Sequence, residues 1–130
     1  MNEKIIRSVQ NLESALQRLE EALTVPKTDS LVIDGTIQRF EFTLELYWKT
    51  LKRLLAWEGI RTRTPREALK QAYHLEWLSD ETIWLQMLHD RNETSHMYDE
   101  RMADVIYERI KIYYPEMKQT FDSLKNLFDL

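Results

Sequence analysis

The segment best equipped for chemistry runs from His89 to Tyr98 and contains Arg91 and His96, separated by four residues. The guanidinium of an arginine presents a planar set of donors that matches the geometry of a phosphate. A histidine can transfer a proton near neutral pH. The chain has three histidines and no cysteine, so other candidate catalytic groups are few. An arginine and a histidine held close together could contact and act on a phosphodiester.

The spacing limits how these two side chains could meet. Residues five apart lie roughly 140° apart around an ideal helix, so Arg91 and His96 would not share a face, whereas Asn92 and His96 would. Either the helix unwinds before His96, or each residue meets its complement from a second copy across a two-fold axis. A homodimer of the second kind would place two histidines and two arginines around one groove. That groove suits metal-free cleavage of RNA, with His96 as the base for the ribose 2′-hydroxyl and the arginines stabilising the phosphorane charge.

The same residues have a purely structural interpretation, which the spacing alone favours. Arg91 could pair with Asp90, with Glu93 or with a carboxylate on another helix. His96 could cap the C-terminus of a helix, where a cationic imidazole is stabilised by the helix dipole.

A metal site is a further alternative for this segment. His89, Glu93 and His96 have the i, i+4, i+7 spacing of one helical face, and zinc sites use such ligands. The surrounding residues are charged and polar, as on any exposed helical turn, so we expect no metal here. The two glycines lie far apart, which excludes a glycine-rich nucleotide-binding loop, and we expect no bound cofactor.

Length and composition narrow the class of protein. We expect 130 residues to form one domain, residues 1–130, with a core large enough to need no disulfide or metal. The absence of cysteine suits a reducing compartment. The N-terminal residues are amphipathic, which argues against a signal peptide, and no apolar run is long enough to cross a membrane. These features predict a soluble cytoplasmic protein.

Charge is distributed unevenly along the chain. The net charge is −4, which argues against a general nucleic-acid coat protein. Residues 49–70, however, hold seven basic and two acidic residues, so this segment carries +5 and the rest of the chain −9. A solvated helix end followed by a loop is the simpler interpretation, and a phosphate-facing patch is the alternative.

Apolar residues recur at helical spacing in several segments. The first stripe runs over residues 5–23 and is followed by Pro26; the second extends to Glu58, with Gly59 placed to cap it. Asp34-Gly35 could be a turn or a weak first turn of this helix. Thr64-Pro65-Arg66-Glu67 predicts the start of a short helix reaching about His74.

Two more helices complete the prediction. Ser79-Asp80-Glu81 opens one of them, and Asp99 caps a last helix whose stripe runs to Phe128 and stays in phase across Pro115. We therefore predict an all-α, up-and-down four-helix bundle with one additional short helix. Fourteen aromatic residues are more than one small core needs, so some should be exposed and mark a partner surface.

Three segments resemble a known family. Residues 39–52 (RFEFTLELYWKTLK) resemble the second helix of the nucleotidyltransferase substrate-binding proteins, which belong to the HEPN superfamily (higher eukaryote and prokaryote nucleotide-binding). Residues 65–69 (PREAL) resemble the short third helix of the family. Residues 90–100 (DRNETSHMYDE) resemble its signature, which consists of an arginine, a polar residue, a spacer, a histidine and a tyrosine.

The resemblance implies a dimeric four-helix bundle encoded beside a minimal nucleotidyltransferase, in pairs that are read as toxin–antitoxin systems. It implies that Arg91 and His96 are ribonuclease residues supported by Asn92. It also implies that Tyr98 is the tyrosine that the partner can modify with AMP, silencing the toxin. The alternative is a non-catalytic adaptor that binds a substrate or nucleotide for the nucleotidyltransferase. Both interpretations predict the same partner, and they differ in whether this chain acts on RNA.

Overall fold

A computed structural model describes residues 1–94 and 99–130 of the chain. All the regular secondary structure within these ranges is α-helical. The helices are α1 (Glu3–Thr24), α2 (Ser30–Trp57), α3 (Pro65–His74), α4 (Glu81–Thr94) and α5 (Glu100–Leu127). The predicted fold class, a helical bundle with one additional short helix, is confirmed.

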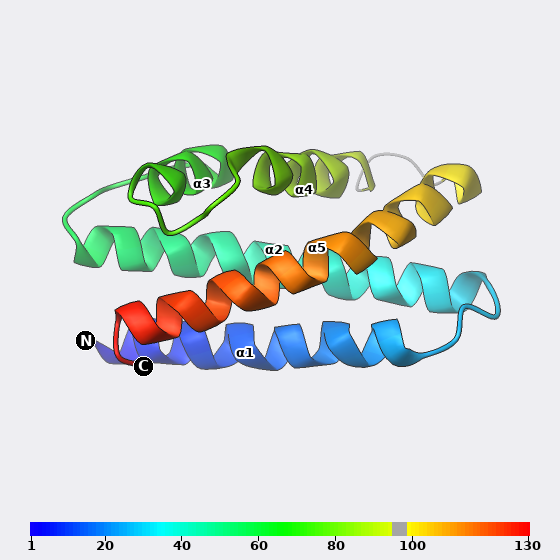
Figure 1. The fold of residues 1–130 in the computed structure, drawn as a ribbon, viewed down its shortest axis with the longest axis horizontal. Coiled ribbons are helices and arrows are strands. Elements are labelled where there is room, and N and C mark those ends of the chain that lie inside the picture. The colour runs from blue at the N-terminus through cyan, green and yellow to red at the C-terminus, as the bar shows by residue number, and fades with distance from the viewer. Residues whose placement is uncertain (95–98) are drawn as a thin grey trace.

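The helices are arranged around α2 (Figure 1). On one side of α2 lies α1, antiparallel to it, while α3 and α4 lie on the opposite side. The last helix, α5, runs back across α1, α2 and α4 toward the end of the bundle where both termini lie. None of the helices in the described part of the chain is long and apolar enough to cross a membrane.

The predicted helix ends are formed by local polar contacts. The Thr64 hydroxyl accepts a hydrogen bond from the Glu67 amide at 3.1 Å, and the Glu67 carboxylate accepts one from the Thr64 amide at 3.3 Å, which completes a capping box. Gly59 adopts a φ of 86°, and the Ile60 amide donates to the Leu55 carbonyl at 2.8 Å, which ends α2 in a Schellman motif.

Two ambiguous positions are settled by the structure. Asp29 caps α2, its carboxylate accepting from the Leu31 amide at 2.9 Å, so Asp34 and Gly35 lie inside the helix and not in a turn. Pro115 lies within α5, which is one helix from Glu100 to Leu127. An apolar stripe that keeps its phase across a proline therefore does indicate one helix here.

The core is built from the predicted stripes and contains large aromatic residues. The Phe40 and Tyr113 rings stack with centroids 5.6 Å apart, and the Tyr47 and Trp84 rings meet edge to face at 4.7 Å. The buried Tyr47 hydroxyl donates to the Met117 carbonyl at 2.8 Å, which links α2 to α5. Exposed aromatic residues, as expected from the excess, are Phe42, Trp57 and Tyr73.

Candidate active site

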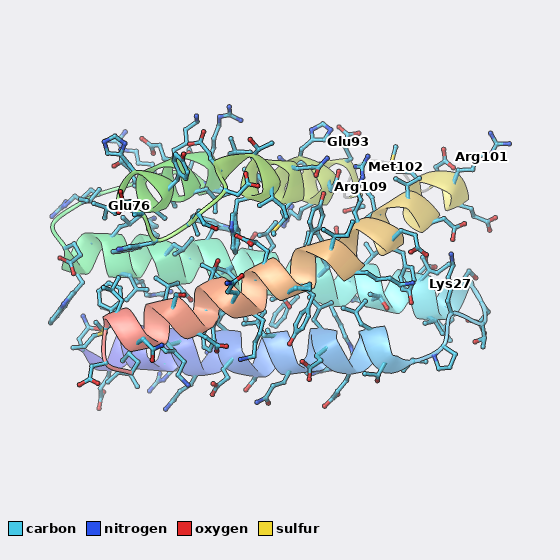
Figure 2. The ribbon with its side chains drawn as sticks, in the orientation of Figure 1. Lys27, Glu76, Glu93, Arg101, Met102 and Arg109 are labelled. Carbon is cyan, nitrogen blue, oxygen red and sulfur yellow. The ribbon has the colours of Figure 1, made fainter. Side chains whose placement is uncertain are left out.

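The last turns of α4 are anchored to α5 by a buried carboxylate, Asp90, which is 1% exposed. The Arg109 guanidinium donates to Asp90 Oδ1 at 2.7 Å, and the Tyr113 hydroxyl donates to Asp90 Oδ2. Arg109 lies on α5 close to the C-terminal end of α4 (Figure 2). A buried carboxylate is stable only when it is paired and hydrogen-bonded, and both conditions are met here. Burial, together with the hydrogen bond to Asp90, raises the pKa of the Tyr113 hydroxyl.

The next residue, Arg91, turns toward α2 and not toward α5. Its Nη2 lies 3.3 Å from Glu45 Oε2, and about a third of its side chain is exposed. Its Nε is buried and has no hydrogen-bond partner within the described residues. The interpretation in which Arg91 pairs with a carboxylate of another helix is therefore confirmed, with Glu45 as that carboxylate.

Glu45 joins several groups at this point. Besides Arg91, its Oε2 accepts a hydrogen bond from the indole Nε1 of Trp48 at 3.1 Å, and its Oε1 lies 3.4 Å from the Lys49 ammonium. One carboxylate thus orients the guanidinium of Arg91 and the ring of Trp48 along the same edge of α2.

Arg91 and Asn92 line the same cleft, which has a volume of about 240 Å³. Its other walls come from α2, α3 and α4: Leu44, Glu45, Trp48, Pro65 and Leu88. The cleft therefore combines a guanidinium, an amide and an indole. These groups can bind a phosphate, make a polar contact to a sugar or base, and stack on a base, respectively.

The final described turn of α4 also contacts α2. The Thr94 hydroxyl lies 2.7 Å from Glu41 Oε2 and 2.9 Å from the Arg91 carbonyl, and can donate to either. Thr94 and Glu41 line a second cleft of about 270 Å³, together with Ile37 and Met102 among others. Contacts to α5 and α2 therefore hold the part of the signature that lies on α4, from Asp90 to Thr94.

Two of the predicted site residues, Arg91 and Asn92, are thus brought together in one cleft. The other two, His96 and Tyr98, lie outside the described residues. Of the metal alternative, His89 and Glu93 are described; their Nε2 and Oε1 atoms are 4.0 Å apart on the exposed side of α4. The third ligand of that alternative, His96, again lies outside the described residues.

Sequence reasoning did not identify Glu45, Arg109 and Tyr113 as neighbours of the site. A signal for Asp90 was present: it follows the buried Met87 by three residues, so it places a charge on the core face of a helix, where a partner is required. Which arginine and which tyrosine would supply that partner depends on how α5 crosses α4, and helical periodicity does not contain that information.

Comparison with known proteins extends these observations. Residues 7–126 match the family described as nucleotidyltransferase substrate binding protein like. The chain is 31% identical over 99 residues to "Probable ribonuclease HepT" of Haemophilus influenzae, a match that covers 72% of this chain and 68% of that protein.

Solved structures show the same fold. A crystal structure of a Thermus thermophilus protein has a TM-score of 0.82 at 32% identity, covering 88% of this chain and 98% of that one. A Haemophilus influenzae structure, described as the fold of a substrate binding domain of a nucleotidyltransferase, has a TM-score of 0.79 at 27% identity and covers 90% and 98%.

A third structure shares the fold at low sequence identity. It is the tri-AMPylated Shewanella oneidensis HEPN toxin in complex with MNT antitoxin, with a TM-score of 0.79 at 16% identity over 97% of this chain and 99% of that one. The family match over residues 7–126 and the relatives above 30% identity place the protein by sequence as well as by fold. This chain belongs to the nucleotidyltransferase substrate-binding protein-like family.

Proposed function

We propose that this chain is a metal-independent endoribonuclease toxin that is neutralised by a minimal nucleotidyltransferase encoded nearby. We further propose that residues 1–130 act as a single HEPN-like domain in the cytoplasm. The observation that carries the proposal is the cleft that holds both Arg91 and Asn92, the first two residues of the signature. It is supported by the name of the relative from Haemophilus influenzae, "Probable ribonuclease HepT".

The proposed chemistry is transesterification at a phosphodiester. His96 takes the proton from the ribose 2′-hydroxyl, whose oxygen attacks the adjacent phosphorus, and the bond to the 5′-oxygen breaks. That oxygen leaves with a proton from an acid in the groove, which yields a 2′,3′-cyclic phosphate and a 5′-hydroxyl. The guanidinium of Arg91 stabilises the charge of the phosphorane, and Asn92 supports the substrate.

We propose that the active form is a homodimer, so that a second copy completes the groove. The surface that supports this lies on α5, where Met102, Val105 and Ile112 are exposed at helical spacing. Their spacing of three and seven residues places them in one stripe, which also passes Arg109. An apolar stripe beside a charged site is suited to packing against a second copy of itself.

The test of the catalytic proposal uses purified protein and RNA in excess EDTA. We expect cleavage with 2′,3′-cyclic phosphate ends, and we expect Arg91→Ala and His96→Ala each to abolish it. Arg18→Ala, on the exposed side of α1, is the matched control and should cut like the wild type. Circular dichroism melting must show that all the variants remain folded. Cleavage that persists in both signature variants would contradict the proposal.

The alternative function is that of a non-catalytic adaptor that binds a substrate or nucleotide for the nucleotidyltransferase. It is favoured by the second cleft, lined by Glu41 and Thr94, and by the family description as substrate binding. Expression of this chain without its neighbour separates the two. Growth arrest that disappears with His96→Ala supports the toxin, whereas normal growth and no cleavage support the adaptor.

We also propose that the partner controls the toxin by adding AMP to Tyr98. The added phosphate would compete for Arg91, and the nucleoside would block the groove. The Shewanella oneidensis protein, which shares the fold, is AMP-modified and bound to an MNT antitoxin. Incubation with the neighbouring nucleotidyltransferase and ATP should raise the mass by one or more AMP units. Tyr98→Phe should prevent this and Tyr73→Phe should not; an unchanged wild-type mass with an active partner would remove the proposal.

A further inference from the structure

The basic segment, residues 49–70, surrounds a cleft that the signature does not use. The cleft has a volume of about 900 Å³ and lies where α2 ends and the chain turns toward α3. Three cations line it, Lys52, Arg61 and Arg63. Its one acidic lining residue is Glu67, whose carboxylate is already hydrogen-bonded to the Arg63 and Thr64 amides in the α3 cap.

The three cations form no ion pair within the part of the chain that the structure describes. Lys49 and Lys70, at the edges of the segment, pair with Glu45 and Glu81, but Lys52, Arg61 and Arg63 form no ion pair there. Three like charges held together around one acidic residue leave a net positive charge, which raises the local concentration of anions. The residues outside 49–70 carry a net charge of −9, so the positive charge is concentrated in one part of the chain.

The wall of this cleft also contains a buried polar residue, Thr62. Thr62 lies between the two arginines and is 5% exposed, and its hydroxyl has no hydrogen-bond partner among the described residues. A buried hydroxyl without a partner costs free energy, so this wall of the cleft is not optimised for stability alone.

The basic cleft and the cleft of Arg91 are both bordered by α2. Trp48 lines the Arg91 cleft, while Lys52 and Ala56 line the basic one, and steps of four residues keep all three on one face of α2. The connection between α2 and α3 also passes both clefts, because Pro65 borders the Arg91 cleft and Arg63 borders the basic cleft. From Glu45 to Ala56 the path along α2 is roughly 16 Å long.

We propose that this face of α2 is a track for single-stranded RNA, with Lys52, Arg61 and Arg63 binding backbone phosphates on one side of the scissile bond. The substrate class follows from the proposed ribonuclease function, on which this inference rests. Trp48, which lines the Arg91 cleft and is oriented by Glu45, is placed to stack on a base. The cations hold the strand by charge, so the track favours no particular sequence.

The test measures binding of a 2′-O-methyl RNA oligonucleotide, which lacks the attacking hydroxyl and cannot be cut. The variant Lys52→Ala/Arg61→Ala/Arg63→Ala should bind roughly 10- to 100-fold more weakly at 0.1 M salt. The salt dependence of its binding should be shallower by about 2 units in log Kd against log salt, as expected for the loss of three single-strand phosphate contacts. The matched control is Lys4→Ala/Arg7→Ala/Arg18→Ala, three exposed residues of α1 with the same loss of charge, and it should bind like the wild type.

The outcomes separate this inference from the proposed function. Equal weakening in both triple variants would show a general charge effect and overturn the track. A wild type that cuts ordinary RNA, with kcat/KM unchanged in the track variant, would overturn the track and leave the ribonuclease standing. A wild type that binds the probe through the track but cuts no RNA would support the track while the ribonuclease proposal fails. Loss of nucleotidyltransferase binding with unchanged RNA binding would assign the patch to a protein interface and overturn the inference.

Discussion

Arg109 of α5 donates a 2.7 Å hydrogen bond to Asp90 of α4, a carboxylate that is 1% exposed and immediately precedes Arg91. Because Asp90 is held by α5, the next side chain points toward α2, where Arg91 meets Glu45. The direction of the candidate catalytic arginine is therefore set by a contact between its own helix, α4, and α5.

Removal of the Asp90 carboxylate should destabilise the fold. Asp90→Ala leaves the buried Tyr113 hydroxyl and the partly exposed Arg109 without their partner, and we expect the free energy of unfolding to fall by about 1–3 kcal/mol. Urea unfolding measures this change. Asp104→Ala is the control, because its pair with Lys27 is exposed, and it should cost less than about 1 kcal/mol. A similar small loss in both variants would show that the buried pair contributes little.

Alkaline pH should weaken the same contact through Tyr113. Burial and the hydrogen bond to Asp90 raise the folded-state pKa of this tyrosine above its ordinary value of 10. The folded chain therefore holds the proton more tightly, so this stabilisation is complete below about pH 10 and is lost as the pH rises above it.

The variant Tyr113→Phe tests the alkaline dependence. Above pH 10, we expect the free energy of unfolding to fall less steeply in this variant than in the wild type, by up to about 1.4 kcal/mol per pH unit. Chemical denaturation at several pH values gives both slopes, and Tyr73→Phe, on the exposed surface, should keep the wild-type slope. Parallel slopes for wild type and Tyr113→Phe would refute the link between this hydroxyl and alkaline stability.

The apolar stripe of α5 provides the test of assembly. A double variant, Val105→Asp/Ile112→Asp, places two charges on residues that are 46% and 66% exposed, so the isolated fold should tolerate it. Light scattering at micromolar concentration should give twice the 15.8 kDa monomer mass for the wild type and the monomer mass for the variant. Leu127→Asp, an exposed apolar position near the other end of α5, should remain dimeric. A monomeric wild type would contradict the shared groove.

The fold could be predicted from the sequence because its determinants are local. The stripes of α1, α2 and α5 repeat at helical spacing, and the caps at Asp99, Thr64 and Gly59 depend on residues only a few positions away. Such signals need no knowledge of how the helices pack.

The sequence predicted two residues that line one cleft, but not the groups that surround them. Arg91 and Asn92 were named from their types and spacing, and both line one cleft. Their orientation depends on Glu45, which lies 46 residues away from Arg91 in sequence, and on the crossing of α5 over α4. Contacts of this kind arise from tertiary packing, which a single sequence does not encode in any periodic signal. The roles of all four predicted site residues, Arg91, Asn92, His96 and Tyr98, stay predictions.

The ion pair between Arg91 and Glu45 implies a competition that can be measured. The Glu45 carboxylate occupies one donor of the guanidinium at 3.3 Å and places a negative charge in the cleft that must accept a phosphate. Glu45→Gln keeps the shape and the acceptor for Trp48 but removes the charge. We expect tighter binding of a 2′-O-methyl RNA oligonucleotide, by roughly three- to tenfold, since a charge contact at 4 Å in water is worth about 1 kcal/mol. Glu13→Gln, in an ion pair with Lys125, removes the same charge elsewhere and should leave the Kd unchanged. Weaker binding in Glu45→Gln would instead show that this carboxylate is needed to hold Arg91 in its binding orientation.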